Sequence, residues 1–165
     1  MGVKWKTTKN DFPKMQARLE QIDGKKVSVG VLGEQAWLAS IHEYGCKIEV
    51  TDKMRAYLHS TGLHLKATTT HITIPERAFL RNGYDENKDD IIAKAEAVIG
   101  DVIDGTMSSN QFFDLIGLLM KSRIQDYARD LDNPPLHPYT VERKGSSNPL
   151  IDSGDMIGAI DYKVE

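Results

Sequence analysis

The sequence predicts an α+β fold, in which a small, mostly antiparallel sheet packs with two longer helices and an extended loop or hairpin excursion spans residues 47–73. Strand-like alternation occurs early in the chain and again at its C-terminal end, whereas helical spacing dominates between them. The chain has 165 residues, of which 40% are hydrophobic and 27% charged, and this composition suits one domain, 1–165, with its own core.

The first two elements are a helix and a strand. Residues 11–22 predict the helix, because apolar residues recur at spacings of three and four and Pro13 fits only a first turn. Residues 27–31 predict the strand, because valines alternate with other residues.

A second helix is predicted for residues 34–45. Trp37, Ile41 and Tyr44 recur at helical spacing, and Gly45 is placed to end the helix as its C-cap.

The excursion then begins with a short strand at 47–51. Residues 52–62 predict a short helix, with Asp52 as its N-cap. Residues 63–66 and 70–75 are extended pieces, and a hairpin between them is the economical interpretation.

Two longer helices follow, at about 86–104 and 109–131. Ser108 and Gln111 have the spacing of a capping box for the second one. The segment 133–150 is rich in Pro, Gly and Ser, which predicts a surface loop.

The C-terminal end is predicted to hold a short helix at 153–159 and a strand at 160–164.

Bulk properties limit the classes of function. The net charge is -3, so the overall balance does not indicate DNA or an acidic membrane as the main partner. Cys46 is the one cysteine, which rules out an intramolecular disulfide and fits a reducing cytoplasm. The N-terminal segment shows neither a signal peptide nor the myristoylation pattern, and no later stretch suits a membrane span.

The tripeptide Asp152-Ser153-Gly154 after an apolar pair resembles the catalytic loop of an aspartic protease. That chemistry needs two carboxylates about 3 Å apart that share a proton, so this chain would have to dimerise to supply the second. The simpler interpretation is that Asp152 or Ser153 caps the short helix that follows, while Leu150 anchors the approach to the core and Gly154 permits a tight bend.

A metal site is a second hydrolase alternative. His42-Glu43 resembles the start of a zinc-protease motif, but the position of the second histidine is Cys46. His59, His64 and His71 have spacings that are unusual for metal ligands. We therefore expect no metal, no cofactor and no enzyme activity; a hydrolase that uses Asp152 or His42 is the alternative.

Three segments, IHEYG (41–45), ITIPERAFLR (72–81) and NPPLHPYTVERKGSSNPLIDSGDMIGAI (133–160), together resemble the tail-completion or neck proteins of long-tailed bacteriophages. Ser153 and Ala78 depart from the commoner residues of that pattern, which are Thr and Pro or Ser. The resemblance implies that a set of structural motif residues carries the fold: His42, Glu43, Gly45, Pro75, Arg77, Phe79, Leu150, Asp152 and Gly154.

The resemblance implies a structural virion protein, or minor tail component, of a phage or prophage. Such a protein completes the top of the tail and joins it to the head connector around the DNA channel. The implied partners are the tail terminator, the head connector and further copies in a six-fold ring, with DNA passing without sequence specificity. The implied locations are the neck of the virion and, during assembly, the cytoplasm of the bacterial host. In isolation we expect a monomer or weak oligomer.

Two residue-level expectations accompany this interpretation. Arg77 is suited to a bidentate contact with the carboxylate of Glu43 or Asp152. The excursion 47–73 is the expected partner surface, because long excursions from compact domains are usually functional. The residues expected to contact the partner are Arg55, Tyr57, His59, His64 and Lys66.

Overall fold

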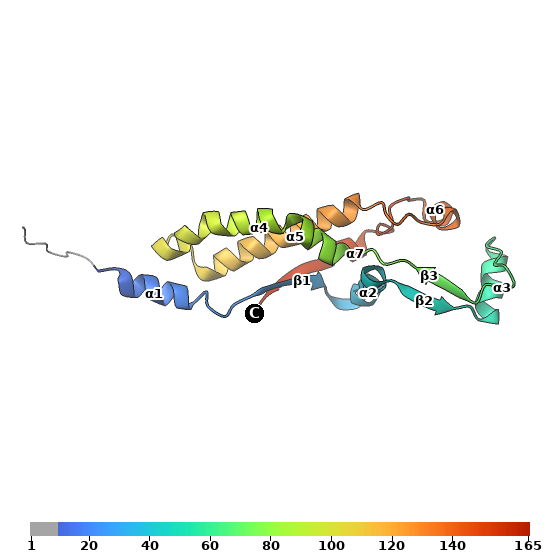
Figure 1. Ribbon diagram of the computed structural model, residues 1–165, viewed down its shortest axis with the longest axis horizontal. Coiled ribbons are helices and arrows are strands. Elements are labelled where there is room, and N and C mark those ends of the chain that lie inside the picture. Colours follow the sequence, from blue (N-terminus) through green and yellow to red (C-terminus); the bar gives the residue numbers. More distant parts are fainter. Residues whose placement is uncertain (1–9) are drawn as a thin grey trace, which may run out of the picture.

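The computed structural model describes residues 10–165; residues 1–9, to which most of the segment examined for targeting signals belongs, lie outside the described part. Its elements confirm the α+β class, with antiparallel strand pairing divided between two two-stranded sheets in that part of the chain. The elements are α1 (Phe12–Glu20), β1 (Val27–Val31), a 3-10 turn η1 (Gly33–Gln35), α2 (Ala36–Tyr44), β2 (Cys46–Glu49), α3 (Asp52–Ser60), β3 (His71–Ile74), α4 (Phe79–Asp104), α5 (Ser109–Asp130), α6 (Pro138–Lys144), α7 (Asp155–Gly158) and β4 (Ile160–Val164). The molecule is elongated, with α1 towards one end and α3 and α6 at the other (Figure 1).

The two long helices, α4 and α5, form an antiparallel pair that runs along the molecule (Figure 1). The predicted capping box is present, because Ser108 Oγ accepts from the N–H of Gln111 and Gln111 Oε1 accepts from the N–H of Ser108. Helix α4 starts at Phe79, seven residues before the predicted Glu86, so the predicted start is wrong. The reason is a cap supplied by another element, described below.

Strand β4 pairs with β1 in an antiparallel register that runs from Val27 opposite Val164 to Val31 opposite Ile160. Both strands lie against α5. Gly117 permits this close approach, because a Cβ at that position would overlap the ring of Tyr162. The last strand of the described chain therefore pairs with the first one.

Strands β2 and β3 form the second sheet, with Cys46 opposite Ile74 and Glu49 opposite His71. The predicted hairpin between 63–66 and 70–75 is wrong: the partner of β3 is β2, and α3 is inserted between them. In place of a ladder, the guanidinium of Arg55 binds three carbonyl oxygens of the connecting loop, those of Leu65, Lys66 and Thr69. We call residues 46–74 the arm, because they extend away from the long helices (Figure 1).

Three local details also differ from expectation. The N-cap of α3 is Thr51, whose Oγ1 accepts from the N–H of Met54, and not Asp52. The loop predicted for 133–150 contains α6, whose start is capped by His137 Nδ1. Helix α2 is present and Gly45 ends it at φ 70°, but it begins at Ala36, after the 3-10 turn η1, and not at Glu34.

Two apolar clusters hold the body together. One joins α2, α4, α5, α7 and β4 through nine buried residues: Ala39, Phe79, Ile124, Ala128, Leu131, Leu150, Met156, Ile157 and Ile160. The other lies between α4 and α5, towards the end of α4 and the start of α5, and consists of Ile91, Val102, Phe112, Phe113 and Ile116. Within residues 10–165, no helix combines the length and the apolar character that crossing a membrane requires.

Candidate functional site

The motif residues of the first two resembling segments meet where α2, the arm and α4 join. Here the chain segment after β3 runs beside the end of α2, with the N–H groups of Arg77 and Ala78 donating to the carbonyl oxygens of His42 and Glu43. A Cβ at Gly45 would lie 2.8 Å from the backbone N of Glu76, and its φ is 70°. The glycine is therefore required by both space and backbone conformation.

Glu43 is the central polar residue of this junction and is 3% exposed. Its two carboxylate oxygens accept from the N–H groups of Leu80 and Arg81 at 2.9 and 3.2 Å, at the N-terminus of α4. Arg81 Nε donates to the same carboxylate at 2.8 Å. A carboxylate at a helix N-terminus satisfies free N–H groups and complements the helix dipole, which explains the early start of α4.

The expected pairing of Arg77 with Glu43 or Asp152 is wrong, because Arg81 occupies Glu43 and Asp152 is exposed on another segment. Arg77 is instead 4% exposed and donates to His42 Nδ1, to the carbonyl of Pro75 and to the carbonyl of Pro134, at 3.2 to 3.4 Å. Its Nε has no hydrogen-bond partner in the described part of the chain. Burial lowers the pKa of this guanidinium.

The contact with Arg77 also affects the protonation state and the tautomer of His42. Burial, followed by the positive charges of Arg77 and Lys144, lowers the pKa of His42 to about 4. The imidazole is therefore neutral at pH 7, and because its Nδ1 accepts from Arg77, its proton is on Nε2. A cation so close opposes a metal ion at this ring, which counts against the zinc alternative for His42.

A cleft of about 420 Å³ lies between the arm and the segment before and within α6, and Arg77 and His42 form part of its wall. The other lining residues are mainly apolar: Leu63, Leu65, Ile72, Thr73, Ile74, Pro75, Pro135, Leu136, His137, Tyr139 and Thr140. None of them is acidic. We call this the arm cleft.

The C-terminal part of the third resembling segment forms the short helix α7 and the turns that lead into it. Leu150 is buried, as expected, and Asn148 Oδ1 accepts from its N–H. Ser153 Oγ accepts from the N–H of Asp155 at 3.4 Å and bonds the Asp155 carboxylate, whereas Gly154 is the N-cap residue at φ 91°. Asp152 itself is exposed and makes no hydrogen bond within residues 10–165; its charge raises the pKa of Lys144, although burial of Lys144 has the larger, lowering effect.

Ala78 carries the one positive φ of a non-glycine residue within 10–165, at 46°. A proline, which the resemblance makes commoner at this position, fixes φ near about −65° and cannot adopt this conformation. The backbone of this chain at Ala78 is therefore incompatible with a proline at that position.

The residues expected to contact a partner have two different roles in the arm. Arg55 is engaged with loop carbonyls, at 2.6 Å for Thr69. Tyr57, His59, His64 and Lys66 are exposed, and the Nδ1 atoms of the two histidines are 2.7 Å apart. Tyr57 and Lys66 are thus accessible to a partner, whereas Arg55 holds the loop of the arm through its carbonyl groups.

A further exposed surface was missed by the sequence analysis. Leu32 is 57%, Trp37 74% and Tyr44 67% exposed, and all three lie in or beside α2. We call residues 32–44 the aromatic segment. Helical spacing identified Trp37 and Tyr44 as residues of one helix but not as exposed ones. The side of α2 that packs into the core carries Ala39, the small residue on the opposite face.

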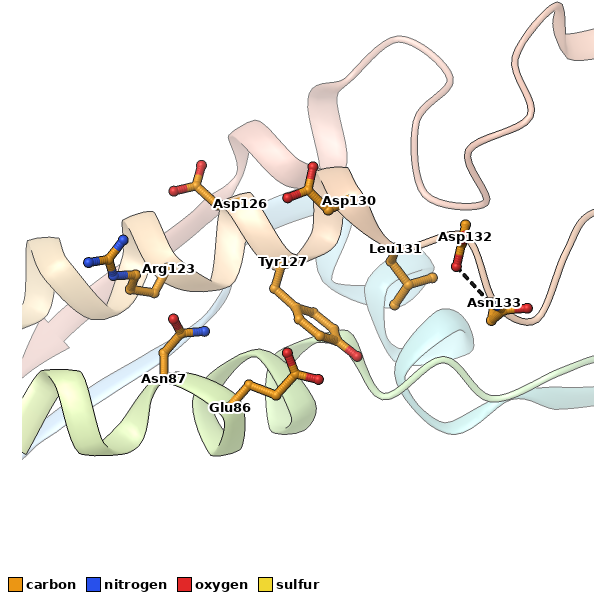
Figure 2. Close-up of a pocket in the computed structure, with 9 residues that line it drawn as sticks. All are labelled: Glu86, Asn87, Arg123, Asp126, Tyr127, Asp130, Leu131, Asp132 and Asn133. Atoms are coloured by element: carbon orange, nitrogen blue, oxygen red, sulfur yellow. Dashed lines mark hydrogen bonds between the residues drawn. The ribbon is translucent and has the colours of Figure 1, made fainter.

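A second cavity, of about 440 Å³, lies between α4 and α5 near the end of α5 (Figure 2). Its polar wall includes four carboxylates, those of Glu86, Asp126, Asp130 and Asp132. Arg123, also in its wall, is bound to Asp90 at 2.7 Å. Within residues 10–165, no group of His, Cys, Asp and Glu side chains is arranged to hold a metal ion.

Comparisons with protein-family models, with curated proteins and with solved structures gave no match to this chain.

Proposed function

We propose that the protein is a structural component of a long-tailed phage or prophage, which completes the top of the tail and joins it to the head connector. The observation that carries the proposal is the exposure of large apolar side chains in the aromatic segment, with Trp37 74% exposed. Tyr and Trp are enriched at protein interfaces, where they contribute much of the binding energy. The arm adds a second surface at the end of the elongated molecule (Figure 1).

The roles of the motif residues support a structural function over catalysis. Glu43 caps α4, Gly45 and Pro75 shape the junction, and Phe79 is fully buried. The first two resembling segments contact each other through these residues, and the contacts are structural ones that need no reacting group. Their purpose in this proposal is to hold the arm at a fixed position on the body.

The partners in this proposal are the tail terminator, the head connector and further copies in a six-fold ring around the DNA channel. With a net charge of -3, the channel face would pass DNA without a strong, general attraction. The protein would act in the bacterial cytoplasm during assembly and in the neck of the virion afterwards.

The test is electron microscopy of particles from a phage or prophage that lacks the gene. We expect separate full heads and free tails, and joined particles when the wild-type gene is supplied on a plasmid. Joined particles in the deletion strain would refute the proposal.

A matched pair of variants locates the contact. Leu32→Ala with Trp37→Ala should fail to restore joining, whereas Ile92→Ala with Leu118→Ala, which removes exposed apolar side chains from α4 and α5, should restore it. Asp152→Asn should also restore joining. A requirement for the Asp152 carboxylate would favour the hydrolase alternative.

A further inference from the structure

Among residues 10–165, Arg77 is a buried cation without a counter-ion. Of the five N–H groups of an arginine, three have acceptors here, all of them uncharged: His42 Nδ1 and two carbonyl oxygens. One of the two remaining groups is the Nε–H, which has no partner among the described residues. No ion pair of Arg77 occurs within residues 10–165, although the residue is 4% exposed.

This arrangement is costly for a protein that functions alone. A buried charge normally requires an opposite charge and full hydrogen bonding, and an arginine with neither is expensive to keep. The planar guanidinium matches the two oxygens of a carboxylate. Arg77 is thus half of a buried ion pair whose other half is missing from the described chain.

The arm cleft supplies access and shape for the missing half. Its volume of about 420 Å³ falls within the range of ligand pockets. Leu63 and Leu65 come from the arm and Leu136 from the segment before α6, so an incoming side chain would be enclosed by apolar groups from two sides.

The charges around the cleft select an anion. Within residues 10–165, no acidic side chain lines it. Lys144, a half-buried cation whose nearest acidic influence is Asp152, lies close enough to Arg77 for each charge to affect the surroundings of His42. His42 accepts from Arg77 and adds no negative charge. A carboxylate would relieve the uncompensated positive charge of Arg77, whereas a cation or a neutral amide would not.

We propose that the arm cleft binds an acidic side chain of a partner protein, with a Glu or Asp carboxylate paired to Arg77 and a neighbouring apolar residue between the leucines of the cleft. The proposal rests on the proposed function in taking the partner to be an adjoining component of the virion. The arm and the segment around α6 lie at the same end of the molecule, where such a component could reach the cleft (Figure 1).

The test uses the purified full-length chain, labelled with ¹⁵N, and two blocked peptides: acetyl-Leu-Glu-Leu-amide and acetyl-Leu-Gln-Leu-amide. We expect the Glu peptide to shift the Nε–H signal of Arg77 and the amide signals of Leu63 and Leu136. The Gln peptide should bind at least about tenfold more weakly, because it leaves the arginine without a counter-ion. No shift at millimolar peptide, or equal shifts by both peptides, would overturn the proposal.

Two substitutions at one position provide the control. His42→Glu places a carboxylate where a side chain already contacts Arg77 Nη1, so it should keep the fold and abolish binding of the Glu peptide. His42→Gln changes the same cleft side chain without adding a charge, so the difference in Glu-peptide binding between the two variants measures the effect of the carboxylate alone. Equal binding by both variants would show that Arg77 is not the recognition group.

Self-association is the competing occupant. If the chain forms a dimer that the Glu peptide dissociates in light scattering, the acidic side chain comes from a second copy and the assignment to a different partner is wrong. The peptide experiment is independent of particle assembly. Peptide binding together with normal head–tail joining in the deletion strain would refute the neck role and retain the cleft, and the reverse result would do the opposite.

Discussion

The carboxylate of Glu43, at the end of α2, accepts the N–H of Arg81 at the start of α4 and the Nε of the same arginine at 2.8 Å. The contact joins residues 38 positions apart in sequence. Arg81 extends further to Glu76 at 2.7 Å and lies over the ring of Tyr44. One buried acid thus fixes where the longest helix begins and how the arm leaves the body.

Replacing Glu43 with Ala should lower the free energy of unfolding by roughly 2–3 kcal/mol, because charged hydrogen bonds to a buried group are lost and the first N–H groups of α4 are left without acceptors. Urea unfolding followed by circular dichroism measures this. The control is Glu76→Ala, which removes the other, exposed partner of Arg81 and should cost less than about 0.5 kcal/mol. Equal costs for the two variants would disprove the central role of Glu43.

The same contact explains what the sequence could and could not predict. Signals that act within a few residues were sufficient for the Ser108–Gln111 capping box, for the Gly45 helix end and for the alternating strand β1. The start of α4 was missed because its cap comes from Glu43, far earlier in the chain. Pattern alone carries no information about a partner at that separation.

The candidate site was predicted less completely than the fold, for related reasons. The segments that meet at the junction were identified, but Arg77 and Arg81 compete for one carboxylate, and only the three-dimensional arrangement decides between them. The pairing of β3 was missed because its partner is β2, which lies on the other side of α3 in the sequence. Arg55 holds the loop between α3 and β3 through the carbonyl groups of Lys66 and Thr69, and such a side-chain contact is not visible in residue periodicity.

Acid should destabilise the protein through His42. The folded-state pKa of about 4 lies below the ordinary 6.5, so the unfolded chain binds the proton more readily. The contribution is fully present above pH 6.5 and is lost progressively as the pH falls from about 6.5 towards 4. Unfolding free energies of the wild type and His42→Gln at several pH values test this, since carboxylate titrations common to both cancel in the difference. Parallel pH profiles would contradict the assignment.

Two helical glycines should respond to alanine with opposite signs. Gly117→Ala should destabilise by about 1–3 kcal/mol, because its Cβ would overlap the Tyr162 ring between α5 and β4. Gly100→Ala in α4 meets open space and should stabilise by about 0.5–1 kcal/mol through helix propensity. Thermal or urea unfolding of the two variants checks the pair; stabilisation by Gly117→Ala would show that β4 does not pack on α5 as described.

The arm should contain residues that hold it together and residues that serve a partner, and substitutions can separate them. Arg55→Ala removes the donor to the carbonyl groups of Lys66 and Thr69, so hydrogen exchange in residues 61–70 should rise while global unfolding changes little. Unchanged exchange in this loop would show that Arg55 does not hold it.

Tyr57, His64 and Lys66 are exposed on the same arm, and their side chains are the ones predicted to meet a partner. Replacing all three with Ala should change the free energy of unfolding little, since exposed substitutions usually stay within about 0.5 kcal/mol each. Hydrogen exchange in the loop should stay near the wild-type level, in contrast to Arg55→Ala. In the complemented deletion strain, however, the triple variant should leave heads and tails separate, because exposed aromatic and basic side chains contribute to interfaces rather than to the core. If the triple variant unfolds, these residues belong to the core of the arm; if it folds and joins particles normally, the contact lies elsewhere, and the aromatic segment at 32–44 becomes the remaining candidate surface.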